Sequence, residues 1–292
     1  MAALDQAGMP LARSRLAAVL PGEVNLVIGL AIVLLAIAVA IAAPLLAPGD
    51  PYEQSLAARL LPPVWNERGT WEHILGTDQL GRDYLSRLIY GARVSLTIGL
   101  LTAAISGLIG VTLGTAAGYF GGRVDTIVTY LVTVRLSMPA VIVALAVVAL
   151  VGNSFMTIMT VLGLLLWDQF ALVSRSMTRQ VVAQDYIVAA KSTGASTFKI
   201  IAREVLPNIL PMVLVVATVE IASAIMVESS LSFLGLGVQP PTPSWGLMMS
   251  EGKEQIFFTS WLILPPGVAL FVLILGINMI GDGLRDRLAP SE

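Results

Sequence analysis

The sequence predicts an all-α integral membrane protein with six membrane-spanning helices, and two observations predict this fold class. Of the 292 residues, 56% are hydrophobic and only 12% are charged, whereas soluble domains carry about a quarter charged residues. Six apolar stretches are also long enough to cross a bilayer, which takes about 20 mostly apolar residues. Lipid is therefore expected to be the main solvent of this chain.

The six predicted spans cover, in order, residues 25–47, 94–119, 126–151, 155–173, 211–234 and 261–280. The first span follows Arg13 and Arg15 and resembles a signal peptide in this respect. Its apolar run is longer than the roughly 7–15 residues of a signal-peptide core, so we interpret it as a retained anchor. A cleaved signal peptide is the alternative.

Basic residues favour a topology with both termini in the cytosol, as tails covering residues 1–23 and 283–292, since cytosolic segments are richer in Lys and Arg. The inner segments would hold Arg13, Arg15, Arg123, Arg175, Arg179, Lys191, Lys199, Arg203, Arg285 and Arg287, against Arg59, Arg68, Arg82, Arg87, Arg93 and Lys253 outside. Most of the outer basic residues lie in one long loop, and long loops influence topology less.

Two long outer segments are predicted. Prolines between residues 48 and 76 predict a loop. The apolar residues of 75–90 recur at helical spacing, and Thr77 or Asp78 could cap a helix start. This pattern predicts an amphipathic helix that lies in the outer interface of the membrane. Residues 24–92 would then comprise the first span, the loop and this helix. The alternative is that residues 75–90 are only a polar lead-in to the second span. Residues 235–260 begin with dense glycine and proline, which predicts no regular helix there.

Residues 185–208 form a polar segment between the fourth and fifth spans. One helix is predicted from Val181 to Ser192 and another from Thr197 to Val205. Gly194 lies between them, and glycine adopts a positive φ at little cost in free energy. Pro207 is expected to end the second helix because it cannot donate to the helix. The small side chains of Ala189 and Ala190 leave a low surface that a partner protein could approach closely. A solvated helix-turn-helix without a partner is the alternative.

Four charged residues fall inside predicted spans. Glu220 and Glu228 are eight residues apart and hence on nearly one helical face. Since membrane carboxylates usually face a cavity or a partner, this face could line a translocation path; alternatively Glu228 reaches the outer interface and Glu220 pairs with another subunit. Arg135 is expected to snorkel toward the cytosolic interface, and Asp168 to lie at that interface.

Several function classes are excluded or disfavoured. The chain has no cysteine, so thiolate metal sites and cysteine nucleophiles are excluded, and its one histidine, His73, cannot form a metal cluster. A net charge of −2 gives no reason to expect a nucleic-acid partner. Residues 194–199 lack the second glycine and the Lys-Ser/Thr ending of a nucleotide-binding P-loop. We therefore expect no enzyme activity, no ATP hydrolysis, no metal and no cofactor bound by this chain.

Four sequence blocks resemble the permease subunits of dipeptide, oligopeptide and nickel-type ABC importers: residues 75–96, 185–208, 230–246 and 278–288. The pattern is similar to the second, C-type permease of the pair. The resemblance implies a type I ABC importer transmembrane domain over residues 93–282, in a bacterial inner membrane. It also implies four kinds of partner: a second permease, two cytosolic ATPases that hold ATP and magnesium, an external substrate-binding protein and the lipid bilayer.

The resemblance also implies site residues. The 185–208 segment matches the signature that docks onto the ATPases, which assigns that role to Tyr186, Val188, Ala189, Ala190, Gly194, Ala195, Leu206 and Pro207. The outer block assigns contact with the binding protein to Gly235, Gly237, Pro240, Pro241 and Trp245.

The chain departs from the family pattern at several positions. Val188 stands where the family has glutamate, and Arg135 stands where relatives have an apolar residue. Glu204 and Thr133 also depart from it. The expected substrate is a di- or oligopeptide; nickel or another small solute is the alternative within this class. An ion-coupled transporter that uses Glu220, Glu228 and Asp168 is the alternative outside it.

Overall fold

The computed structural model describes residues 21–288, which form helices and loops with no β-strand in this range. The α-helices are α1 (Pro21–Ile41), α2 (Ala43–Leu46), α3 (Tyr84–Phe120), α4 (Gly122–Leu136), α5 (Ala140–Val151), α6 (Phe155–Leu165), α7 (Asp168–Val182), α8 (Asp185–Ser192), α9 (Thr197–Ile200), α10 (Leu206–Phe233), α11 (Trp245–Glu254) and α12 (Leu264–Leu288). Five helical stretches are long and apolar enough to cross a membrane: Glu23–Ile41, Tyr84–Phe120, Phe155–Val182, Thr197–Phe233 and Ser260–Leu288. A bent pair, α4 with α5, would make a sixth span.

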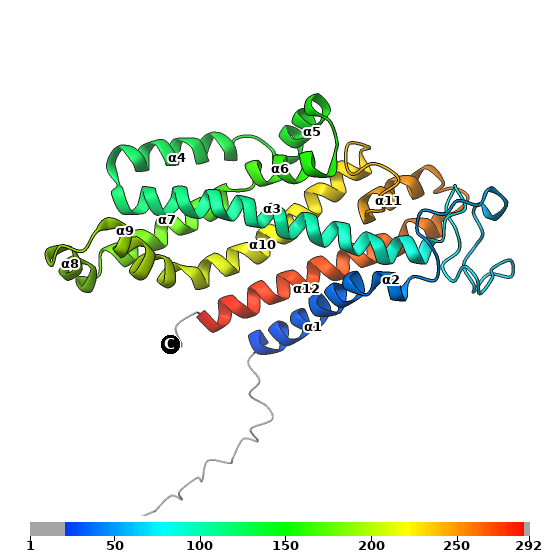
Figure 1. Cartoon of the computed structure of the whole chain (residues 1–292), viewed down its shortest axis with the longest axis horizontal. Helices are drawn as coiled ribbons and strands as arrows, with labels where there is room; N and C mark the ends of the chain where they lie inside the picture. The colour runs from blue at the N-terminus through cyan, green and yellow to red at the C-terminus, as the bar shows by residue number, and fades with distance from the viewer. Residues whose placement is uncertain (1–20, 289–292) are drawn as a thin grey trace, which may run out of the picture.

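The long helices run side by side along one axis (Figure 1). The helices α3, α7 and α10 lie between α1 and α12 on one side and α4, α5 and α6 on the other. The loops before α3 gather with α11 at one end of the bundle, at the right of the figure, and α8 and α9 project at the opposite end. At the start of α1 and the end of α12, Glu23 Oε1 lies 3.7 Å from Arg287 Nη2, so the two terminal helices meet there.

A ridge of glycines brings α3 into close contact with α7. Gly110, Gly114 and Gly118 recur at every fourth position and so lie on one face of α3. A Cβ atom on any of them would overlap the backbone of α7, at the carbonyl oxygens of Trp167, Ala171 and Arg175 respectively. Small residues spaced four apart are a common way for membrane helices to approach closely. This contact holds α7 rigidly against the longest helix of the bundle.

The third predicted span, residues 126–151, is not one straight helix. The chain forms α4 and α5, which are bent by 85° across the break between Leu136 and Ala140. Pro139 is the N-cap residue of α5, and its ring is incompatible with a continuous helix through this position. The stretch predicted as one span is therefore two helices, and together they would make the sixth span.

The fourth predicted span, residues 155–173, is too short. The helical stretch extends to Val182, with a local break at Leu166 and Trp167 between α6 and α7. The residues that extend the helix, 174–182, are polar on one face. They lower the mean hydropathy, so the apolar stretch in the sequence ends before the helix does. As a result Asp168 lies in the middle of the stretch and not at its inner end.

Pro207 does not end a helix, contrary to the sequence prediction. The helix continues from Thr197 to Phe233 through a π-helical turn at Ile201–Val205. At the end of this turn the amide of Leu206 donates to the carbonyl of Ile201, five residues earlier. Pro207 then sits within the first two residues of α10, where an amide proton is not needed. The wider turn thus accommodates the proline without interrupting the helix.

The predicted interfacial helix over residues 75–90 is also wrong. Residues 75–83 form turns, and α3 begins only at Tyr84 and runs directly into the second span. The N-cap is Asp83, whose side chain accepts from the amide of Ser86 at 2.8 Å, and neither Thr77 nor Asp78 caps the helix. The alternative interpretation, a polar lead-in to the span, describes the structure.

The last outer loop contains a helix that the sequence analysis excluded. Its first ten residues are irregular, as the prolines predict, but α11 begins at Trp245. Ser244 caps this helix by accepting from the amide of Leu247 at 3.1 Å. The proline-rich run therefore ends at a capped helix start, a signal that the density of glycine and proline obscured.

Candidate functional site

The segment between the fourth and fifth predicted spans is an elbow made of two short helices, α8 and α9. Gly194 lies in the turn between them with φ of +84°, which confirms the positive φ expected at this glycine. A side chain here would meet no atom within 4 Å, so the glycine is required by backbone conformation and not by crowding. Ser196 caps α9 by accepting from the amide of Lys199 at 3.3 Å.

The underside of the elbow is anchored in the bundle by its own apolar cluster. Ile187 of α8 and Ile200 of α9 are fully buried and pack with Val205 and Ile209. Residues of α3 and α7 complete the cluster, namely Val111, Tyr119, Met177, Val181 and Val182. Because both arms of the elbow share this cluster, displacement of the elbow must move the helices attached to it.

Two polar contacts tie the elbow to neighbouring helices. The ammonium of Lys191 lies 4.9 Å from the centre of the Tyr119 ring at the end of α3. The side-chain amide of Asn208, at the start of α10, donates to the Tyr186 hydroxyl at 3.4 Å. The elbow is therefore attached to α3 and α10 as well as to α7.

The opposite face of the elbow is exposed and partly apolar. Of the residues assigned to ATPase docking, Tyr186, Val188, Ala189 and Gly194 are exposed, Ala190 and Ala195 are half-buried, and Leu206 and Pro207 lie exposed on α10. Phe198 of α9 is 81% exposed, more than any of the apolar side chains in the predicted set. The sequence analysis missed Phe198, although an aromatic residue within a polar segment was visible there.

The two carboxylates of α10 have different surroundings. Glu228 is fully buried, and its Oε1 accepts from the Ser232 hydroxyl at 2.6 Å. The same Ser232 oxygen accepts from the amide of Val238 at 3.2 Å, which links Glu228 to the outer loop. Glu220 is 4% exposed and instead lines a cavity of about 430 Å³. The shared face expected for the two residues therefore does not give them a shared environment.

Arg135 and Asp168 line the same cavity as Glu220. Arg135 Nη2 lies 3.8 Å from Asp168 Oδ1, and Arg135 Nε donates to the carbonyl oxygen of Leu165. Arg135 thus points into the protein and does not snorkel to the interface, because the bend after α4 places it beside the α6–α7 break. Asp168 is 4% exposed and lies near the middle of the Phe155–Val182 stretch, so the position expected for it near the inner end of a span is wrong as well.

The outer-loop residues assigned to the binding protein divide into two groups. Gly235, Pro240 and Pro241 are exposed, whereas Gly237 and Trp245 are buried. The Trp245 indole donates to the carbonyl oxygen of Leu88 at 2.8 Å and packs against Gly91 of α3. Trp245 is thereby an anchor for α11 within this chain, and its contact with an external protein stays a prediction.

A buried ion cluster joins the start of α3 to α11, and the sequence analysis did not predict it. Arg87 is fully buried and lies 3.0 Å from Asp78 Oδ2 and 2.8 Å from Glu251 Oε2. Arg82 reaches the same two carboxylates, at 2.6 Å and 3.0 Å. Burial, opposed by Arg82 and reinforced by Asp78 and Glu254, raises the pKa of Glu251 to about 7.

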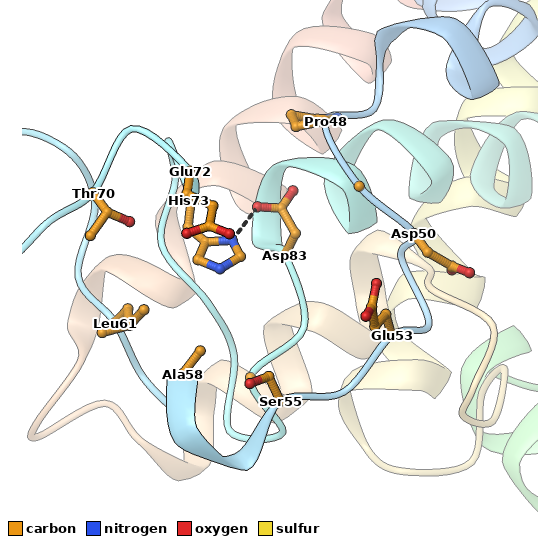
Figure 2. Close-up of a pocket in the computed structure, with 12 residues that line it drawn as sticks. Pro48, Asp50, Glu53, Ser55, Ala58, Leu61, Thr70, Glu72, His73 and Asp83 are labelled. Carbon is orange, nitrogen blue, oxygen red and sulfur yellow. Dashed lines mark hydrogen bonds and ion pairs between the residues drawn. The ribbon is translucent and has the colours of Figure 1, made fainter.

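His73 lies beside this cluster in an outer cavity of about 450 Å³ (Figure 2). Its Nδ1 is 3.0 Å from Asp83 Oδ1, and Asp50, Glu53 and Glu72 also line the cavity. No group of three or more His, Asp or Glu residues in the described part of the chain is arranged to hold a metal ion. Asp83, as the cap of α3, links this cavity wall to the second span.

Comparison with known proteins identifies relatives over nearly the whole chain. Residues 110–291 match the model of the binding-protein-dependent transport system inner membrane component. Residues 26–63 match the N-terminal transmembrane domain of oligopeptide transport permease C. The chain is 39% identical to the di/tripeptide transport system permease protein DppC of Pseudomonas aeruginosa over 90% of this chain and 87% of that protein. It is 37% identical to the dipeptide transport system permease protein DppC of Haemophilus influenzae, over 90% of each.

The fold is also found in a solved structure. The inward-facing methionine ABC transporter MetNI superposes with a TM-score of 0.53 at 17% identity, covering 70% of this chain and 97% of the matched chain. This likeness shows a fold of the type I importer kind. With the family match over more than half of the sequence, the chain belongs to the family of binding-protein-dependent transport system inner membrane components, among its C-type permeases.

Proposed function

We propose that this chain is one of two permease subunits that together form the translocation pore of an ATP-driven, binding-protein-dependent importer of di- and oligopeptides. Its other partners would be two cytosolic ATPases, which bind ATP and magnesium, and an external substrate-binding protein. The membrane would be a bacterial inner membrane with both termini in the cytosol. Dipeptide permeases at 37–39% identity support the peptide substrate, with nickel or another small solute as the alternative.

The observation that carries this proposal is the elbow formed by α8 and α9. It projects at the end of the bundle where α4 begins and α7 ends (Figure 1). These segments and the elbow carry the basic residues Arg123, Arg179, Lys191 and Lys199, which supports a cytosolic position. Its outer face exposes Tyr186, Val188 and Phe198, and its underside is fixed to α3, α7 and α10. A surface that is apolar outside and rigidly anchored inside suits a protein partner that moves it.

The transport cycle follows from this attachment. When ATP closes the two ATPases, their movement would displace the elbow, and α7 and α10 would move with it. ATP would thereby shift the population between two pore states through its different affinity for them. The inner side would close while the outer side opens to the loaded binding protein, which we expect to contact the exposed Gly235, Pro240 and Pro241.

The pore-lining part of this chain would be the face of α10 that carries Glu220. The cavity beside Glu220 shares Met226 and Ser230 with a second cavity of about 370 Å³ that extends to Met249 of α11. The two together form a hollow along α10 toward the outer end. For Glu228, which lines neither cavity, we propose a structural role in holding the outer loop through Ser232.

A single exposed residue tests the docking surface. We expect Phe198→Glu to abolish co-purification of the ATPases with the permease pair and to abolish ATP-driven uptake of the dipeptide Ala-Ala into proteoliposomes. Because Phe198 is 81% exposed, the substitution should leave the fold intact. Phe258→Glu is the matched control, since Phe258 is 87% exposed at the opposite end of the bundle and should retain both properties.

Two results would contradict the proposal. Retention of the ATPases by Phe198→Glu would remove the elbow as the docking surface. Uptake of Ala-Ala by this chain without any ATPase would favour the ion-coupled transporter instead.

A further inference from the structure

The cavity beside Glu220 contains an unusual set of charges for the interior of a membrane bundle. Its walls come from the end of α4, from α5, from the α6–α7 break and from α10, and they include Arg135, Asp168 and Glu220. The polar side chains of Gln169, Ser223 and Ser230 line it as well. Ionisable residues at membrane depth are costly, so such a set requires a function.

Arg135 is already occupied by protein groups. Its Nε donates to the carbonyl oxygen of Leu165, its Nη1 donates to that of Met138 at 3.3 Å, and its Nη2 faces Asp168 at 3.8 Å. The last distance makes the contact with Asp168 a loose one. Asp168 also lies in the first turn of α7, where the positive end of the helix dipole favours a negative side chain.

Glu220 is the member of the set without a partner. It is 4% exposed, and within residues 21–288 its carboxylate has no hydrogen bond and no ion pair within 4.0 Å. A buried carboxylate in this position leaves its acceptor capacity directed at the cavity. With Arg135 balanced against Asp168, the ionised form of Glu220 gives the cavity an excess of one negative charge.

We propose that Asp168 and Glu220 form a transient site for the ammonium group of the substrate as it crosses the membrane. An ammonium carries three donors and one positive charge, which match two acceptor-only carboxylates and the excess charge of the cavity. The volume of about 430 Å³ lies within the range of small-ligand sites. This inference rests on the proposed function, and it adds the chemical group that the pore recognises.

The two carboxylates stand on the two helices that emerge from the elbow. Asp168 is the first residue of α7, which leads into α8, and Glu220 lies on the continuous helix that begins with α9. Displacement of the elbow would therefore change the separation of the two carboxylates. The affinity for the ammonium group would change with it, so that the substrate is held in one pore state and released in the other.

The absence of cysteine from the chain allows a direct test of the sign of the charge. In the assembled transporter, Ser223→Cys places a thiol in the cavity, one turn from Glu220. The thiolate attacks a methanethiosulfonate reagent, forms a mixed disulfide and releases methanesulfinate. Mass spectrometry of this chain would give the rates for the cationic aminoethyl reagent and the anionic sulfonatoethyl reagent, each divided by the rate with a free thiol in solution.

We expect the cationic reagent to be preferred by about tenfold or more after this correction, as a focused negative potential requires. Adding Glu220→Gln should reduce the preference to within about threefold of the free thiol, and adding Arg135→Gln should increase it. Glu228→Gln is the matched control, because this carboxylate is on the same helix but lines no part of the cavity, and it should leave the preference unchanged.

The outcomes separate this inference from the function on which it rests. Equal rates for the two reagents, or a preference that Glu220→Gln does not change, would overturn the ammonium site while leaving a water-accessible path. A thiol at position 223 that neither reagent modifies would overturn both the site and the path. Failure of the Phe198→Glu variant to lose its ATPases would contradict the docking proposal without affecting these rates.

Discussion

The buried ion cluster at the outer end makes a quantitative prediction about the attachment of α11. Two arginines, Arg82 and Arg87, alternate with two carboxylates, Asp78 and Glu251, so the four charges balance once Glu251 has lost its proton, above its pKa of about 7. Arg87→Met removes one positive charge and leaves Asp78 and Glu251 to share Arg82. Removing one partner of a buried pair costs about 3–5 kcal/mol because the other charge stays buried without compensation.

The expected loss can be measured as a shift of the thermal transition of the purified complex. If about 1 kcal/mol corresponds to 2–4 °C for a domain of this size, Arg87→Met should lower the melting temperature by about 6–20 °C. Hydrogen exchange should localise the loss to α11 and to the turns before α3, because these are the segments that the cluster joins.

A double variant provides the control. Arg87→Met with Glu251→Met leaves a neutral pair, Arg82 and Asp78, joined at 2.6 Å. The double variant should therefore lose less stability than the sum of the two single variants, by about 1–3 kcal/mol. Strict additivity, or a shift below about 2 °C for Arg87→Met alone, would refute the argument that the cluster acts as one unit.

Three further predictions concern other parts of the bundle. In the folded state the pKa of Glu251 is about 7, against an unfolded value of 4.5. Its contribution to the free energy of unfolding should therefore be complete below pH 4.5 and be lost as the pH rises through 7. Melting temperatures measured across this range should show the fall, and Glu251→Gln should flatten it. Gly114→Val should separate α3 from α7 and prevent assembly of a monodisperse complex. Gly121→Ala meets no atom within 4 Å, so it should keep the complex monodisperse at a cost of about 1–3 kcal/mol of backbone strain, because Gly121 has φ of +63° and ψ of −154°. Size-exclusion chromatography distinguishes the two variants. Gly194→Val should lower Ala-Ala uptake more than ATP hydrolysis. The altered turn would misplace Phe198 relative to α8, while the buried apolar cluster under the elbow would keep its packing. Equal loss of both activities would contradict this.

Much of the fold was predictable because hydropathy depends on neighbouring residues alone. Five of the predicted spans correspond to helical stretches long enough to cross a membrane. Two helices on either side of a positive-φ Gly194 are confirmed, although the first begins at Asp185 and not at Val181. The glycine ridge of α3 was also visible in the sequence, since Gly110, Gly114 and Gly118 recur at a fixed spacing. Its partner was not visible, because nothing local to α3 specifies that the ridge meets α7.

The errors concern residues whose conformation depends on distant parts of the chain. Arg135 was expected to snorkel because it lies early in the predicted span, yet the bend at Pro139 places it beside Leu165 and Asp168. Pro207 was expected to end a helix, but the preceding π-helical turn accommodates it. Trp245 was assigned to contact with the binding protein because the outer block resembles that of the family, and the structure buries it against Gly91. Tertiary contacts account for Arg135 and Trp245, whereas the adjacent turn accounts for Pro207.

Clusters of charged side chains lie at three positions along the bundle, and they differ in burial and in net charge. At the outer end the charges are balanced and buried, in the cluster of Asp78, Arg82, Arg87 and Glu251. At the end of the bundle near the elbow, Asp125 of α4 forms ion pairs with Arg175 and Arg179 of α7 near solvent. Water there reduces the free-energy cost of the remaining net positive charge. Between them lies the set of Arg135, Asp168 and Glu220, which is buried and, with Glu220 ionised, unbalanced. A cluster that satisfies its own charges can fasten helices together, whereas an unbalanced one needs a counter-charge from outside the chain. The middle cluster is therefore the place in this bundle where a passing cation would gain most, and α7 connects it directly to the elbow.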